Sequence, residues 1–197
     1  MSDDETLKVY AAKAQDYADL VSAGDAENPL LTAFIAALPP GGSARDLGCG
    51  PGNSAARMAD AGLKVTAFDP VPEMVALAAA HPHVDARVAG FDDVTGVALY
   101  DGIWANFSLL HAARSDMPRH LEALATALKP GGRFHIGMKT GTGEKRDPIG
   151  RLYTYYTDAE LTGLLADVGL TVTDRTTGRE KGLDGVEADW ICLAAHG

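Results

Sequence analysis

Apolar runs alternate with mixed, helix-like stretches along most of the chain. Five short apolar runs predict strands, at residues 43–47, 64–68, 84–88, 102–106 and 133–138. The stretches before and between them predict helices, at residues 4–22, 29–37, 53–61, 72–80 and 117–128. Such an alternation is typical of a parallel sheet that carries helices on both faces.

The last third of the chain departs from this alternation. Residues 139–150 are polar and rich in glycine, which indicates an irregular segment. A helix is predicted at 158–168, followed by apolar runs at 170–174 and 190–195 that a charged loop separates. We therefore expect an α/β, Rossmann-like fold: a doubly wound, mostly parallel sheet of seven strands, with helices on both faces and a C-terminal antiparallel hairpin.

Length and composition limit the class of protein. The 197 residues suit one domain, residues 1–197. Within it we expect an N-terminal helical cover at 1–40, a cofactor-binding core at 43–138, and a substrate-side loop with the hairpin at 139–197. No run approaches the roughly 18 apolar residues of a membrane span, and the acidic start differs from a signal peptide. We expect a cytoplasmic protein without a membrane partner.

Charge and cysteine usage exclude further classes. The net charge is −10, whereas proteins that bind a phosphate backbone usually carry a basic face, so nucleic acid is not the expected partner. The two cysteines, Cys49 and Cys192, are far apart and lack a zinc-type spacing. We expect reduced thiols and no metal. The oligomeric state does not follow from the sequence.

The most informative segment follows the first predicted strand. Residues 46–52 read D-L-G-C-G-P-G and place Gly48, Gly50 and Gly52 between a strand and a helix. Alternate glycines let the backbone turn tightly and approach a ligand closely. The free N–H groups of the following helix point into the same crevice, so a cofactor site is expected here.

Two cofactors could use this loop. Residues 50–55 also satisfy the dinucleotide pattern G-x-G-x-x-A, and Asp69 lies 19 residues after Gly50, near that pattern's spacing to its ribose-binding acid. However, a carboxylate at Asp46 sits badly beside a pyrophosphate and well beside an ammonium group and a sulfonium. The chain also lacks the Tyr-x-x-x-Lys pair of short-chain dehydrogenases and leaves too little length for a separate substrate domain. S-adenosylmethionine is the favoured cofactor.

Four segments carry a family resemblance. Residues 46–52 resemble motif I of the class I methyltransferases, which use S-adenosylmethionine. Residues 65–69 resemble the family's second strand with its terminal acid, residues 100–105 the opening of strand four, and residues 128–132 the turn before strand five. In its short length, its N-terminal helix and its lack of a large inserted substrate domain, the chain resembles compact bacterial methyltransferases of the tellurite-resistance type.

The resemblance implies a role for each residue of the cofactor site. Gly48, Gly50 and Gly52 would line the methionine and ribose side, and Asp46 would hold the amino group. Asp69 would accept hydrogen bonds from both ribose hydroxyls. The other implied contacts are Pro70, Phe91 and Asp92 around the adenine, Ala105 and Asn106 beside the methionine moiety, and Tyr10 and Tyr17 on the covering N-terminal helix. Ordinary core packing stays open as the alternative for the three aromatic residues.

Methyl transfer mainly requires alignment of the acceptor and exclusion of water, so an obvious catalytic dyad is not needed. If the acceptor must lose a proton, His111 is the candidate base, because it follows strand four and imidazole titrates near neutrality. A purely structural role is its alternative. In the stretch after strand five, Lys139, Arg146, Arg151 and Tyr153 predict a lid that receives an anionic or polar small molecule; a solvated loop with internal ion pairs is the alternative.

The expected function is therefore an enzyme that transfers a methyl group from S-adenosylmethionine to an unidentified small molecule. Two other functions stay open. One is a non-catalytic module that binds S-adenosylmethionine or its product S-adenosylhomocysteine, and the other is an NAD(P)-dependent oxidoreductase. The matching motifs concern the cofactor, and a fold does not confer an acceptor.

Overall fold

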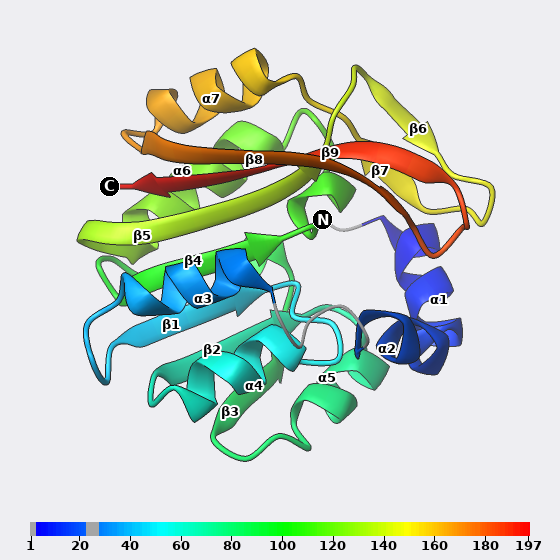
Figure 1. Ribbon diagram of the computed structural model, residues 1–197. Coiled ribbons are helices and arrows are strands. Elements are labelled where there is room, and N and C mark those ends of the chain that lie inside the picture. Colours follow the sequence, from blue (N-terminus) through cyan, green and yellow to red (C-terminus); the bar gives the residue numbers. More distant parts are fainter. Residues whose placement is uncertain (1–2, 23–27) are drawn as a thin grey trace.

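One seven-stranded sheet forms the centre of the molecule (Figure 1). The computed structural model describes residues 3–22 and 28–197. The strands lie in the order β3-β2-β1-β4-β5-β9-β8, with the bounds β1 Ser43–Leu47, β2 Lys64–Asp69, β3 Val84–Val88, β4 Tyr100–Asn106, β5 Leu128–Lys139, β8 Thr171–Lys181 and β9 Glu187–His196. The strands from β3 to β5 are parallel, and β9 is antiparallel to β5 and to β8. The predicted fold class is confirmed.

Helices cover both faces of this sheet (Figure 1). Their bounds are α1 Asp4–Ala12, α2 Ala14–Ser22, α3 Pro29–Ala36, α4 Asn53–Asp60, α5 Pro72–Ala78, α6 Met117–Ala127 and α7 Asp158–Asp167, with short 3-10 turns at Phe91–Asp93 and Leu109–His111. Among the described residues, none of these helices is long and apolar enough to cross a membrane.

The core consists of two apolar clusters, one on each face of the sheet. Leu31 of α3 and Met58 of α4 belong to the first cluster, and Leu121 of α6 and Leu165 of α7 to the second. Strand β4 shows why both faces are apolar: Ile103 and Ala105 pack in the second cluster, and Trp104 between them packs in the first. Successive side chains of a strand point to opposite faces, so a strand buried on both sides reads as a continuous apolar run.

The structure corrects several predicted boundaries. The predicted helix at 4–22 is two helices, because Lys13 takes a non-helical conformation between α1 and α2. The predicted hairpin is much longer than its apolar runs, since β8 and β9 stay paired as far as Lys181 and Glu187. Most of β8 is exposed, so its outer half lacks the apolar signal of a strand, although its threonines favour strand structure.

The segment expected to be irregular, residues 139–150, contains one strand of a second, two-stranded sheet, and the other strand follows directly after it. Strand β6, Glu144–Arg146, pairs with β7, Leu152–Thr154, in antiparallel register. We call residues 144–154 the substrate-side hairpin. It lies near α1, and α1 and α2 lie beyond the carboxyl ends of β1 and β2 (Figure 1). The substrate-side hairpin and the two N-terminal helices thus enclose the end of the sheet where a ligand is expected.

Gly52, the N-cap residue of α4, is needed for the packing of α4 on α5. Its φ is 90°, and a Cβ there would lie 2.7 Å from Cα of Ala78. Gly62 has a similar φ of 86°, but a Cβ there would meet nothing within 4 Å. We expect Gly62→Ala to cost about 1 kcal/mol from backbone strain alone, and Gly52→Ala to cost about 1–3 kcal/mol more from the clash. Urea denaturation of both variants measures the difference, and equal losses would contradict this account.

Candidate functional site

Two adjoining cavities lie at the carboxyl ends of β1, β2 and β4. The larger has a volume of about 340 Å³ and the smaller about 60 Å³. Five residues line both: Tyr10, Tyr17, Gly48, Gly50 and Phe107. Tyr10 comes from α1 and Tyr17 from α2, while the glycines follow β1 and Phe107 follows β4. The two N-terminal helices therefore form a shared wall where the two cavities meet.

Asp69, at the end of β2, organises the smaller cavity. Its carboxylate accepts hydrogen bonds from the backbone N–H groups of Gly50 and Val71, each at 2.9 Å. Burial raises the pKa of Asp69 to about 6, against the opposing effect of these two hydrogen bonds. Each carboxylate oxygen has a further lone pair, so Asp69 can still accept hydrogen bonds from a ligand. Pro70, Met74 and Phe91 complete the apolar part of this cavity.

The glycine loop between β1 and α4 forms the floor of both cavities. Gly48 has a φ of 71°, and a Cβ there would lie 2.3 Å from Cβ of Ser108. Gly50 has a φ of 52°, and a Cβ there would meet only the ring of Tyr17, at 3.4 Å. These two positions require glycine for different reasons: Gly48 because another loop approaches its backbone, and Gly50 because its conformation is left-handed.

Asp46 and Asn106 present polar groups to the larger cavity. Asp46, at the end of β1, is buried and lines the cavity wall. The side-chain oxygen of Asn106 lies 3.0 Å from Nε2 of His135, which therefore donates to it. Its carboxamide NH₂ is then the group that can donate toward the cavity. The next residue, Phe107, has a φ of 52°, a strained conformation for a non-glycine residue and one that is often found at functional sites.

The buried histidines behind the cavities make the fold sensitive to acid. Burial lowers the pKa of His135 to about 3 and that of His111 to about 4, both below the unfolded value of 6.5. The unfolded chain therefore binds more protons in this range, so stability is present above pH 6.5 and is lost as the pH falls toward 4. Asp69, whose pKa is raised, acts in the opposite direction.

We expect His135→Gln to reduce the acid sensitivity. From pH 7 to pH 5 the free energy of unfolding of the natural protein should lose about 2 kcal/mol through His135, and the variant should be spared that loss. Urea denaturation at the two pH values gives the difference between the two proteins, in which the contributions of His111 and Asp69 cancel. An identical pH dependence in both proteins would show that His135 does not contribute.

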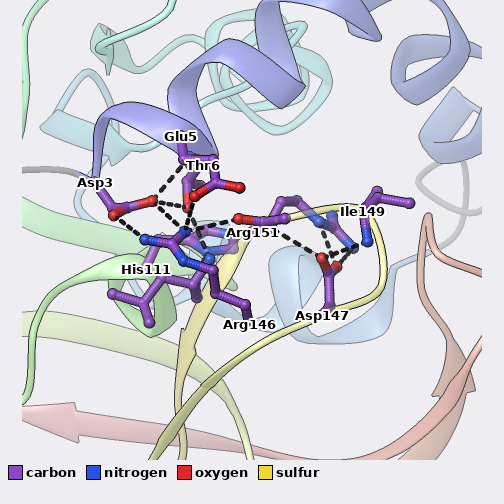
Figure 2. A network of polar contacts seen from close by, with 10 residues as sticks. Asp3, Glu5, Thr6, His111, Arg146, Asp147, Ile149 and Arg151 are labelled. Carbon is purple, nitrogen blue, oxygen red and sulfur yellow. Dashed lines mark hydrogen bonds and ion pairs between the residues drawn. The ribbon is translucent and has the colours of Figure 1, made fainter.

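Helix α1 is fastened to the substrate-side hairpin by polar contacts (Figure 2). The guanidinium of Arg146 donates to both carboxylate oxygens of Asp3, at 2.7 and 2.8 Å, and pairs with Glu5 at 3.2 Å. The backbone N–H of Leu152 donates to the hydroxyl of Thr6 at 2.8 Å. Figure 2 shows Arg146 turned toward α1. Arg146 lines neither of the two cavities.

A second set of contacts joins α1 to the hairpin inside the site. Arg151 donates to Asp147 at 2.8 Å and to the hydroxyl of Tyr10 at 2.9 Å. That hydroxyl lies 2.9 Å from Nε2 of His111, whose Nδ1 lies 2.6 Å from the carbonyl oxygen of Leu152. A carbonyl only accepts, so Nδ1 carries the proton, Nε2 accepts, and Tyr10 donates to His111. Both nitrogens of His111 are thus engaged.

The structure brings most of the predicted site residues to the cavities. These are Asp46, Gly48, Gly50, Asp69, Pro70, Phe91, Asn106, Tyr10, Tyr17, His111, Lys139, Arg151 and Tyr153. Four others line neither cavity: Gly52, Asp92, Ala105 and Arg146.

Each of these four residues has another structural role. Gly52 packs against α5, and Ala105 is fully buried in the core. Asp92 pairs with Arg119 at 2.5 Å on the surface and lines neither cavity, and its predicted contact with an adenine edge stays a prediction. Arg146, predicted as an acceptor contact, fastens α1 to the hairpin instead.

Sequence reasoning missed one wall of the larger cavity. This wall comes from the tip of the β8–β9 hairpin and from α2, and its residues are Glu180, Lys181, Gly182, Leu183, Ala188, Trp190, Leu20 and Val21. The tip was expected to be only a charged connector. The available signal was the set of threonines in β8, whose β-branched side chains favour an extended strand.

Comparisons with known proteins agree with this arrangement. Residues 45–132 match the family described as "Methyltransferase domain". A ubiquinone biosynthesis O-methyltransferase from Xanthomonas axonopodis pv. citri is 32% identical over 124 residues, which are 58% of this chain and 51% of that protein. A ubiquinone/menaquinone biosynthesis C-methyltransferase from Rubrivivax gelatinosus is 39% identical over 92 residues, 45% of this chain and 36% of that protein. The chain thus spans about half or less of the length of these two relatives.

Solved structures share the fold over nearly the whole chain. The 1,6-didemethyltoxoflavin-N1-methyltransferase of Burkholderia thailandensis, solved with 1,6-didemethyltoxoflavin and S-adenosylhomocysteine, has a TM-score of 0.79 and 24% identity, and the match covers 98% of this chain and 87% of that one. A methyltransferase from Methanosarcina mazei has a TM-score of 0.74 and 17% identity, and the match covers 86% and 97% of the two chains. The predicted resemblance to the class I methyltransferases is confirmed; the resemblance to the tellurite-resistance type stays a prediction.

Proposed function

We propose that this protein, whose core is a class I S-adenosylmethionine-dependent methyltransferase domain, is an enzyme that methylates a small molecule. The observation that carries the proposal is the pair of adjoining cavities with a shared wall. The smaller has a buried carboxylate and apolar walls, which suit a nucleoside. The larger has room for the rest of the cofactor and for an acceptor beside it.

The described residues fit S-adenosylmethionine. Asp69 would receive the ribose hydroxyls, Phe91 would pack near the adenine, and Asp46 would attract the amino group. The left-handed Gly50, which carries no Cβ and lines both cavities, would let the backbone approach the ligand. When bound, this cofactor supplies a methyl group that is activated by a positively charged sulfur. The protein's own contribution is to align the acceptor and to exclude water, which can supply roughly 7–11 kcal/mol of barrier reduction.

A small acceptor suits the larger cavity better than a macromolecule does. Its volume of about 340 Å³, bounded in part by α2 and the hairpin tip, lies in the range of small-molecule sites. If the acceptor loses a proton, His111 can take it only through Tyr10, since Tyr10 occupies its Nε2. Nucleic acid is not an expected partner, because the net charge of −10 disfavours binding to a phosphate backbone.

According to their names, the relatives methylate oxygen, carbon or nitrogen atoms, so they do not agree on the kind of atom that this protein would methylate. The proposal is tested by calorimetric titration of the purified protein with S-adenosylmethionine, S-adenosylhomocysteine and NADH. We expect micromolar binding of the two sulfur nucleotides and no binding of NADH. A screen of small-molecule acceptors by mass spectrometry then follows. Binding of NADH alone would overturn the proposal, and cofactor binding without transfer to any acceptor would favour a binding module.

A further inference from the structure

A row of three residues crosses the sheet at the edge of the larger cavity. Lys139 ends β5 and is the direct cross-strand partner of Trp190 in β9, which is in turn the partner of Gly178 in β8. Directly paired residues of adjacent strands have their side chains on the same face, close enough to act together. Lys139 and Trp190 both line the larger cavity, and neither is part of the cofactor motifs.

Gly178 allows the indole of Trp190 to lie flat across β8. A Cβ at Gly178 would lie 2.3 Å from Cζ2 and 2.6 Å from Cε2 of Trp190, so the ring occupies the place of a side chain. Phe107 meets the indole nearly at right angles, with ring centroids 6.0 Å apart. Packed in this way between Gly178 and Phe107, the indole also lines the larger cavity. An aromatic surface held in this way is a platform for a flat ring.

Two lysines line this cavity, Lys181 at the exposed tip of the β8–β9 hairpin and Lys139 half-buried at the end of β5. Lys139 is the one that is paired directly with Trp190. Its ammonium lies 3.9 Å from the ring centroid of Tyr153, and within the described ranges no carboxylate oxygen lies within 4.0 Å of it. By contrast, Arg151 is paired with Asp147 at 2.8 Å. Arg146, the third predicted acceptor contact, is held by Asp3 outside the cavity.

Resting on the methyl transfer proposed above, we propose that the acceptor is a flat, ring-containing anion that stacks on Trp190 and places its charge at Lys139. The ring face gives dispersion contact over a large area, and the half-buried ammonium gives a charge-assisted hydrogen bond to a carboxylate or an ionised ring oxygen. The acceptor class is thus defined by two neighbouring groups on one face of the sheet.

The test uses three bicyclic probes with the protein saturated with S-adenosylhomocysteine. The probes are 2-naphthoate, which is flat and anionic, 2-naphthamide, which is flat and neutral, and decahydro-2-naphthoate, which is anionic and not flat. Calorimetry measures affinity. Fluorescence reports the place of binding by comparison with the Trp190→Phe variant, because the chain has only two tryptophans and the other, Trp104, also lines this cavity. We expect 2-naphthoate to bind about tenfold more tightly than either other probe and to perturb the emission of Trp190.

Lys145 provides a matched control for Lys139. Its ammonium also lies over a tyrosine ring, that of Tyr155, but it is exposed and lines neither cavity. We expect Lys139→Met to abolish the preference for naphthoate over naphthamide, Lys145→Met to keep it, and Trp190→Phe to remove the fluorescence response. Gly178→Ala, which does not line the cavity, should weaken all flat probes by displacing the indole.

The outcomes separate this inference from the proposed function. Failure of S-adenosylhomocysteine to bind would overturn both. When S-adenosylhomocysteine binds normally, three results would contradict the proposed acceptor class and leave the proposed function in place. These are that no probe binds, that the three probes bind equally, or that Lys139→Met keeps the preference for naphthoate. For an acceptor found in the screen, Lys139→Met should raise the KM for that acceptor by about tenfold and change kcat less.

Discussion

Replacement of Arg151 by methionine should lower the free energy of unfolding by about 3–5 kcal/mol, because it leaves the partner carboxylate buried without a counter-charge. The side chains of Arg151 and Asp147 are only 2% and 4% exposed, and they lie 2.8 Å apart. Asp147 also accepts hydrogen bonds from the backbone N–H groups of Ile149 and Arg151, so its burial is built into the hairpin. Arg151 donates in addition to Tyr10, so its loss also detaches α1 from the site.

Two further variants make the interpretation specific. In the double variant with Asp147→Asn the buried charge is removed, and most of the lost stability should return. Arg146→Met breaks the exposed ion pairs of the same hairpin and should cost less than about 1 kcal/mol. Urea denaturation of all three variants provides the comparison. A cost for Arg151→Met as small as that for Arg146→Met would show that the buried pair is not a structural requirement.

Asp69→Ala should weaken the binding of S-adenosylhomocysteine by at least about 100-fold, since two charge-assisted hydrogen bonds to ribose would be lost together. The variant also removes the acceptor for the N–H groups of Gly50 and Val71, which hold the loops around the smaller cavity. Asp69→Asn keeps the shape of the side chain but not its charge, and we expect an intermediate loss. Calorimetry on both variants measures the effects.

The raised pKa of Asp69 gives this binding a pH dependence. With a pKa of about 6 in the free protein, the carboxylate is mostly ionised at pH 7 and mostly protonated at pH 5. A protonated carboxyl is a weaker acceptor of the ribose hydroxyls, so affinity should fall as the pH falls through 6. The Asp69→Asn variant should show no such change between pH 5 and pH 7. A flat profile in the natural protein would place the ribose elsewhere.

The fold was predictable where secondary structure and burial are linked. Strands buried on both faces, such as β4, read as continuous apolar runs, and their order follows from the rules for parallel sheets. The outer half of the β8–β9 hairpin was not predictable in this way, because cross-strand pairing holds it while its side chains stay exposed. The break at Lys13 was missed for a related reason: both halves of the N-terminal segment favour helix by themselves.

The candidate site was predictable as far as local sequence determines it. The glycine loop and Asp69 belong to short sequence motifs, and the residue types in these motifs directly indicate a tight turn and a carboxylate at the end of a strand. Contacts between distant segments are different. That Arg146 meets Asp3 while Arg151 turns to Tyr10 depends on how the substrate-side hairpin packs on α1, which no local pattern records. The sequence predicted one role for Lys139, Arg146 and Arg151, whereas their packing gives them different contacts.

The two sides of the larger cavity come from parts of the chain that are constrained differently. The glycine loop lies inside the segment that matches other methyltransferases, while Lys139 and Trp190 lie after its end at residue 132. The β8–β9 hairpin thus lies outside the part of the chain that carries the cofactor motifs. If the acceptor binds as proposed, substitutions between residues 178 and 190 would change its contacts and leave the glycine loop as it is, so the choice of acceptor could change while the methyl donor stays the same.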